Sequence, residues 1–266
     1  MTAATQAMSN ADRNLGRRVG FGEAVRFEWT KFRTARSTVV LAVVMGAVLP
    51  VFAVVVAATG SLMPDDTILG ASLLGGAVIA QVIAAVLGAL LITGEFKTGM
   101  IRTTLTACPR RLEVLAAKST VAAAVTFAVI LPSAAAAYGI GLMMLDDTIY
   151  PSGEPFPAIV GAALALASIA VLGVGIGTIV RHSAGATAAV VGVVLMPGLL
   201  APLLGDGARW LGGASLNGVM QKMVQSSEAT PEAVGSLGAW PSLLVVAAYT
   251  VAVVFGAVWI LRHRDT

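Results

Sequence analysis

The chain has 266 residues, of which 57% are hydrophobic and only 12% charged, and its mean hydropathy is +0.88. Soluble globular domains carry about 25% charged residues, so the composition excludes a soluble protein and predicts an integral membrane protein. The net charge of +3 could indicate a nucleic-acid partner, but membrane topology accounts for the basic residues, and we expect no nucleic acid. The single cysteine, Cys108, excludes an intrachain disulfide.

The N-terminal region divides into two parts. Residues 1–20 are polar, lack the apolar core of a signal peptide and are predicted to form a disordered cytoplasmic tail. Residues 21–36 place large apolar side chains at spacings of four, four and three, which is one face of a helix: Phe21, Val25, Trp29 and Phe32. We expect an amphipathic helix in the inner membrane interface, with basic residues toward anionic headgroups. A cytoplasmic extension of the first span is the alternative.

Six apolar segments follow, each long enough to cross a hydrocarbon core of roughly 30 Å as a helix. They are continuously apolar rather than alternating, which favours helices over a β-barrel. The predicted fold is an all-α membrane domain over residues 37–266. The predicted spans are 38–59, 69–93, 114–142, 157–180, 185–204 and 241–261.

The distribution of Lys and Arg predicts the orientation. Fifteen of the 17 lie in the N-terminal region, between the second and third spans, in the turn at Arg181, or after the last span. Only Arg209 and Lys222 fall on the other side. Because basic residues accumulate on the cytoplasmic side, we expect a multi-pass protein of the cytoplasmic membrane with both termini inside.

The loop between the last two spans, residues 205–240, is the longest predicted outer loop. Its segment 215–224, SLNGVMQKMV, has the pattern of a short amphipathic helix. This helix could form a lid over a pathway, or the loop could lie on the surface.

Few residues inside the spans could carry chemistry. Gln81 is the polar residue nearest the centre of a span, and it could make a helix-packing hydrogen bond or bind a substrate in a pathway. Gly173 and Gly177 lie four apart and predict a close helix contact. Lys118, in the first turns of the third span, is expected to stand in the cytoplasm or to snorkel to it.

Signatures of enzymes and cofactors are missing from the sequence. It has no HExxH motif, no cysteine or histidine cluster for a metal, and no GxxxxGK[ST] loop for ATP. We therefore expect a protein that is not an enzyme, that binds no metal or cofactor itself, and that depends on a partner for energy.

The polar, basic stretch 93–118 interrupts the apolar pattern most strongly. Glu95 is expected just beyond the end of the second span, Gly99 permits a chain reversal, and Pro109 would end a short helix over 98–107. Arg110 and Arg111 would then anchor the third span at the headgroups. A short helix held between two spans can act as a lever.

This stretch resembles the E-x-x-x-G-T-h-x-x-x-L-x-x-x-P-x-R region of ABC-2 type transporter permeases, which ends in a lysine that Lys118 matches here. Met100 departs from the family, in which threonine is usual. Four further segments are similar to an actinobacterial subgroup, so that the resemblance spans nearly the whole chain. They are EWTKFRTARST (28–38), RHSAGA (181–186), AWP (239–241) and RHRD (262–265).

The resemblance implies a permease that pairs with a second six-span permease, the same or different, and with two copies of an ABC-type ATP-binding subunit that hold ATP and Mg²⁺. It implies that 21–36 is a connecting helix and that the 93–118 stretch contains a coupling helix. It further implies a salt bridge or helix-end interaction for Glu95 and a turn at Gly99. The residues implied in coupling are Glu95, Gly99, Arg102, Leu105, Pro109, Arg110 and Arg111. The arginines could instead serve as topology anchors alone.

The leading hypothesis is therefore a subunit of an exporter for a hydrophobic or amphipathic compound. A membrane anchor or sensor that recruits a cytoplasmic partner without transport is the alternative. An intramembrane enzyme has no residue pattern to support it.

Overall fold

The structure is a computed structural model that describes residues 20–60, 62, 65–100, 111–227 and 229–263. Every regular element in these residues is a helix, and six helices are long and apolar enough to cross a membrane. This confirms the predicted all-α membrane fold. The six spans are α3 (Arg36–Thr59), α4 (Ile68–Thr98), α6 (Arg111–Met144), α7 (Pro155–Val180), α8 (Ser183–Leu200) and α12 (Ala239–His263).

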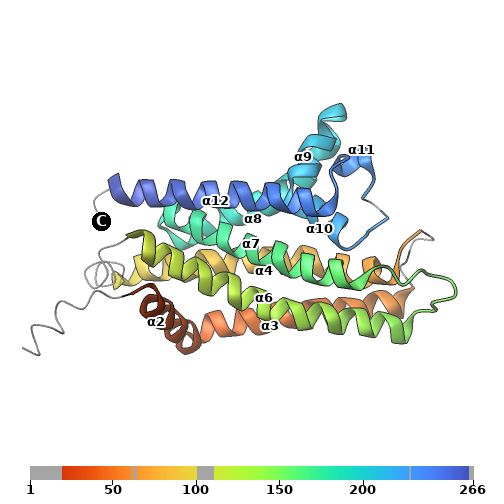
Figure 1. Cartoon of the computed structure of the whole chain (residues 1–266), viewed down its shortest axis with the longest axis horizontal. Helices are drawn as coiled ribbons and strands as arrows, with labels where there is room; N and C mark the ends of the chain where they lie inside the picture. The colour runs from red at the N-terminus through yellow and green to blue at the C-terminus, as the bar shows by residue number, and fades with distance from the viewer. Residues whose placement is uncertain (1–19, 61, 63–64, 101–110, 228, 264–266) are drawn as a thin grey trace, which may run out of the picture.

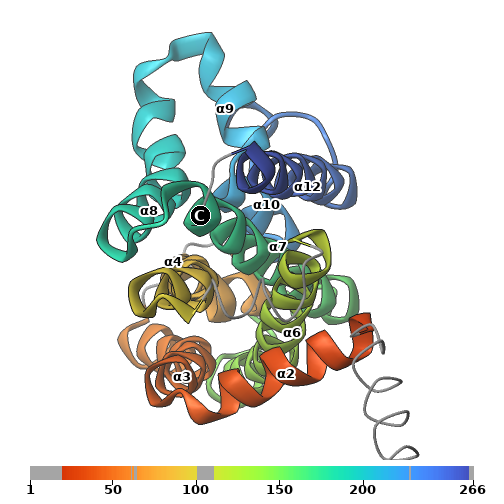
Figure 2. The same cartoon turned by 90° about the vertical axis from the view of Figure 1, so that its left-hand side faces the viewer.

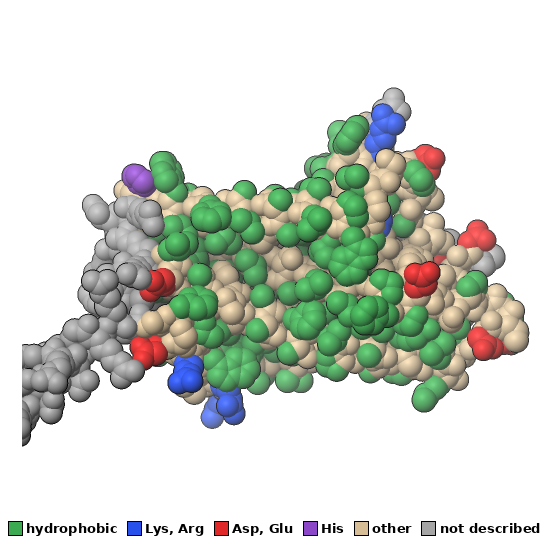
Figure 3. Space-filling model, viewed as in Figure 1, with side chains coloured by type: hydrophobic (Ala, Val, Ile, Leu, Met, Phe, Trp, Pro, Cys, Tyr) green, Lys and Arg blue, Asp and Glu red, His purple; other side chains and the backbone are tan. Residues whose placement is uncertain are grey.

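The spans lie side by side along the long axis of the molecule (Figure 1). On the face seen in Figure 3, hydrophobic side chains cover the middle of the bundle, and most of the charged side chains lie toward its two ends. One end carries the short helix α2 (Phe21–Thr34) and the end of α12 (Figure 1). The opposite end carries the loops that hold acidic residues, among them Asp65, Asp146, Asp147 and Glu154.

Two span boundaries differ from those predicted by more than three residues. Helix α4 continues to Thr98, five residues beyond the predicted end, because Glu95 is buried and paired inside the bundle rather than placed in water. Helix α8 ends at Leu200 rather than at 204, and the chain tightens there into the 3₁₀ helices η1 (Ala201–Leu203) and η2 (Gly205–Gly207). Hydropathy could not locate either change, since the charged residues Glu95 and Lys97 suggested an earlier end for α4 and the apolar residues after Leu200 suggested a later end for α8.

The centre of the bundle is the contact between α4 and α7, which is made by small residues. A Cβ on Gly88 would lie 1.9 Å from the carbonyl oxygen of Ala170, and one on Gly173 would lie 2.2 Å from that of Ala85. On Gly177 it would lie 2.7 Å from a side-chain carbon of Ile92. The predicted close-packing face is confirmed, and the two backbones approach as only glycine permits.

The segment between α8 and α12 contains three short helices, α9 (Ala208–Ala214), α10 (Leu216–Met223) and α11 (Pro231–Val234). The predicted helix in SLNGVMQKMV is confirmed as α10. Its apolar residues are buried against α4, α7, α8 and α12, because Leu216, Val219, Met220 and Met223 lie on one face. The expectation of a surface-lying loop is therefore wrong for α10.

Candidate functional site: an ionic cluster of three helices

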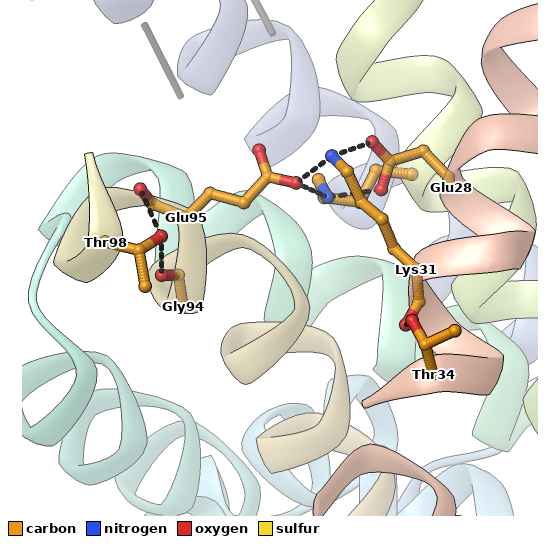
Figure 4. Close-up of polar contacts among 7 residues, drawn as sticks. Glu28, Lys31, Thr34, Gly94, Glu95 and Thr98 are labelled. Atoms are coloured by element: carbon orange, nitrogen blue, oxygen red, sulfur yellow. Dashed lines mark hydrogen bonds and ion pairs between the residues drawn. The ribbon is translucent and has the colours of Figure 1, made fainter. Parts of the chain in front are cut away.

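Four charged side chains from three helices meet at the end of the bundle that carries α2. Glu28 and Lys31 come from α2, Glu95 from α4 and Lys118 from α6. Figure 4 shows Glu95 reaching across from its helix toward Glu28 and Lys31. We call these four residues the ionic cluster.

Each ammonium group of the ionic cluster contacts both carboxylates. Lys31 Nζ lies 2.9 Å from Glu28 Oε1 and 2.5 Å from Glu95 Oε1. Lys118 Nζ lies 2.5 Å from Glu28 Oε2 and 2.8 Å from Glu95 Oε1. These are short, charge-assisted hydrogen bonds, and together they close a ring in which two positive charges balance two negative ones.

The helical periodicity of α2 turns Glu28 toward the bundle and brings Lys31 next to it. Ala24, Glu28 and Phe32 lie four apart and are the buried residues of the helix, so a carboxylate stands in the middle of the face that packs on the bundle. Lys31 lies three residues after Glu28, within reach of it on the adjacent turn. Helix α2 runs across the ends of α3 and α6 (Figure 2).

Lys118 corrects an expectation from the sequence. Its side chain does not snorkel to water: Lys118 is only 1% exposed and is among the largest fully buried side chains. The reason is that α2 covers the beginning of α6 and supplies Glu28, so that a buried partner is available where the sequence alone suggested only solvent. A buried lysine without such partners would cost several kcal/mol.

The electrostatics of the ionic cluster keep Lys31 charged. Burial by itself would lower the pKa of Lys31, but its hydrogen bonds to Glu95 and Glu28 and their negative charges outweigh burial and raise that pKa above its ordinary value. The second oxygen of Glu95, Oε2, is buried and has no hydrogen-bond partner among the described residues.

The geometry of the ionic cluster shows how it positions helices. The described residues include no group of three or more His, Cys, Asp or Glu side chains that could hold a metal. What the arrangement can do is join α2 to α4 and α6. A buried ion pair contributes little net stability but makes the loss of one partner costly, so the cluster specifies how these helices sit together.

The polar stretch predicted as a coupling arm begins within the described residues. Glu95 forms the salt bridges described above, and Gly99 ends α4 with a left-handed φ of 72°, its N–H bonded to the carbonyl of Phe96. Other residues named for coupling, Arg102, Leu105, Pro109 and Arg110, lie outside the described residues, as does the proposed short helix. Arg111 begins α6, but its side chain also lies outside the description.

The predicted apolar face of α2 is divided in the structure. Phe32 is buried and Val25 half-buried, whereas Phe21 and Trp29 are exposed. The helix turns the face of Ala24, Glu28 and Phe32 to the bundle and leaves Trp29 on its flank. The placement of the four apolar residues in the membrane interface stays a prediction.

Gln81 is fully buried in α4, and neither its amide oxygen nor its nitrogen has a hydrogen-bond partner among the described residues. The packing hydrogen bond expected from the sequence is therefore not made there. A role of Gln81 in a pathway stays a prediction.

Sequence reasoning named Glu95 but missed the contribution of α2. Glu28 and Lys31 were recognised only as part of a segment with family resemblance, not as a site. The available signal was a carboxylate at the centre of an otherwise apolar helix face, four residues from both Ala24 and Phe32.

In comparisons with known proteins, neither a protein-family model nor a curated protein matches the chain.

Proposed function

We propose that this chain is the membrane-spanning subunit of an ATP-driven transporter of the ABC-2 type, moved by a separate ATP-binding subunit. The observation that carries the proposal is the ionic cluster at the base of the 99–110 arm. Glu95 lies four residues before Gly99, and Lys118 lies seven residues after Arg111. Both ends of the arm are thus tied to one another and to α2.

This arrangement suits the transmission of force. A push on the arm would reach α4 at Glu95 and α6 at Lys118, and the ionic cluster would carry it to α2 through Glu28 and Lys31. Charge attraction falls only gradually with distance, so the three helices can shift by fractions of an ångström while remaining attached. Resemblance of the sequence around Glu28, Glu95 and Lys118 to ABC-2 permeases supports the same interpretation.

In this proposal the end with α2 faces the cytoplasm, where basic residues gather, and both termini lie on that side of the cytoplasmic membrane. ATP and Mg²⁺ bind to two copies of the partner subunit, because this sequence has no P-loop pattern. A second six-span permease completes the transporter. The cargo is hydrophobic or amphipathic, since the spans carry mainly apolar side chains, and the direction is export.

Two glycines provide a matched test of the arm. Gly99 and Gly60 both end a span with a left-handed φ, 72° and 63°, and a Cβ on either would meet nothing within 4 Å. Alanine at each position therefore introduces a similar strain of roughly 1–2 kcal/mol, but only Gly99 adjoins the arm. Gly60 lies at the opposite end of the bundle.

The experiment is to purify the chain mildly from its native membrane through a C-terminal tag and to identify copurifying proteins by mass spectrometry. We expect an ATP-binding subunit, whose hydrolysis in proteoliposomes responds to amphipathic compounds. Gly99→Ala should reduce this response several-fold, and Gly60→Ala should leave it unchanged. Repeated preparations without any nucleotide-binding protein would instead favour the anchor that recruits a cytoplasmic partner. Equal effects of the two substitutions would show that the arm has no specific role in coupling ATP hydrolysis to transport.

A further inference from the structure

The outward flank of α2 carries basic residues that have no acidic partner within the described part of the chain. Arg26 and Arg33 lie seven apart, with Trp29 three residues after the first and four before the second, so all three share one face. All three are exposed. No ion pair joins either arginine to a described residue, and the neighbouring Glu23 accepts a hydrogen bond from the Gly20 N–H.

Trp29 packs against Phe32, its neighbour on the next turn of α2. Its ring stacks on that of Phe32, with centroids 6.0 Å apart and planes inclined by 22°. Phe32 is buried between α2 and the bundle, so one side of Trp29 packs on a buried ring although 44% of its surface is exposed. A tryptophan between two arginines combines a flat apolar ring with two phosphate-binding groups.

The length of α3 places this flank at the membrane surface. Its 24 residues give a helix of about 36 Å, which exceeds the roughly 30 Å hydrocarbon core by only a few ångström. Ala35 alone separates α2 from α3, and Val40, in the second turn of α3, is already 58% exposed on the apolar surface. Helix α2, which crosses the ends of α3 and α6 (Figure 2), therefore lies in the headgroup layer.

We propose that Arg26, Trp29 and Arg33 form a binding surface for the phosphate headgroup of an anionic phospholipid. The arginines supply charge complementarity to the headgroup, and Trp29 lies at the boundary with the acyl chains. The inference rests on the orientation in the proposed function, since anionic lipids are enriched in the cytoplasmic leaflet. An acidic protein surface would not account for an exposed tryptophan at the membrane boundary.

Trp29 itself can report the contact. In a chain whose other tryptophans are replaced (Trp210→Phe, Trp240→Phe, Trp259→Phe), Trp29 fluorescence is measured in nanodiscs containing 6,7-dibromo phosphatidylglycerol or 6,7-dibromo phosphatidylcholine at equal fractions. We expect quenching by the anionic lipid to reach half its maximum at a several-fold lower lipid fraction. Replacing one arginine with glutamine should raise that fraction about fivefold, and high salt should act in the same direction.

Arg209→Gln is the matched control, because Arg209 is exposed in α9 at the other end of the bundle, and it should leave the quenching unchanged. Equal quenching by the two lipids, or a preference that survives Arg26→Gln with Arg33→Gln, would overturn the proposal. No quenching by either lipid would also overturn it, because Trp29 would then not contact the lipid. The measurement needs no ATP-binding subunit, so its outcome is independent of the transporter proposal.

Discussion

Helix α4 is held at two places by opposite physical means. At its middle, Gly88 brings the α4 backbone against that of α7, with no room for a side chain. Near its end, Glu95 reaches Lys31 and Lys118 through charge-assisted hydrogen bonds. The first contact is short-ranged and loses its energy with a small displacement, whereas the second weakens gradually. The comparison indicates a fixed centre, α4 with α7, and an adjustable end, where α2 and α6 meet α4.

Removing a lysine from the ionic cluster tests the adjustable end with the largest expected effect. Lys118→Met leaves Glu28 and Glu95 buried with only Lys31 to balance them, and breaking a buried pair in this way costs about 3–5 kcal/mol. We expect the free energy of unfolding in detergent to fall by that amount. Lys97→Met, at an exposed position on the same end, is the control and should change it little. A loss below about 1 kcal/mol would mean that water reaches the cluster freely.

Adding one methyl group tests the fixed centre. Gly88→Ala places a Cβ against the backbone of Ala170, and such overpacking costs about 1–3 kcal/mol. Gly94→Ala on the same helix is the control, because its Cβ would meet nothing within 4 Å. In detergent, the midpoint of thermal unfolding should be clearly lower for Gly88→Ala than for Gly94→Ala. Equal midpoints would show that α4 and α7 can move apart without penalty, which contradicts a fixed centre.

A double substitution measures how the ionic cluster shares its energy. Glu95→Gln combined with Lys118→Met removes one charge of each sign and leaves Glu28 beside Lys31, 2.9 Å apart. We expect the double variant to lose less stability than the sum of the two single variants, by about 0.5–3 kcal/mol. Chemical denaturation of all four proteins gives this coupling energy directly. Strict additivity would mean that Glu95 and Lys118 act independently despite their contact.

Lys31 should matter less than Lys118, because its side chain is 20% exposed and Lys118 only 2%. Water screens the charges that remain after Lys31→Met, so we expect a loss of about 1 kcal/mol. The same unfolding assay checks the ranking. A larger effect for Lys31 than for Lys118 would reverse the assignment of Lys118 as the buried centre of the cluster.

Of the changes considered, alkaline pH is expected to alter the free energy of unfolding least. The folded-state pKa of Lys31 is raised above its ordinary value of 10.5, so its stabilising contribution is complete below pH 10.5 and is lost as pH rises through the folded-state pKa. We therefore expect the stability difference between wild type and Lys31→Met to stay constant from pH 7 to about 10 and to shrink above that range. If the stability difference between wild type and Lys31→Met instead became smaller as the pH falls from 10 to 8, the raised pKa of Lys31 would be contradicted.

Sequence periodicity and composition by themselves determined the membrane class, the six spans and the short helix α10. The glycine contact was also predictable, because Gly173 and Gly177 lie four apart on one helix. These features depend on residues that are close in sequence, and an apolar segment of sufficient length has one stable solution in a bilayer.

The tertiary structure alone decided the ionic cluster and the flank of α2. Lys118 lies 90 residues from Glu28 and 23 from Glu95, and no local pattern fixes which distant carboxylate a lysine will meet. The side of α2 that faces the bundle depends on its packing against α3 and α6, so the sequence could predict an amphipathic helix but not that Phe32 is covered while Trp29 is exposed. Burial is a property of the assembled helices, and it turned a lysine expected in water into the centre of a buried site.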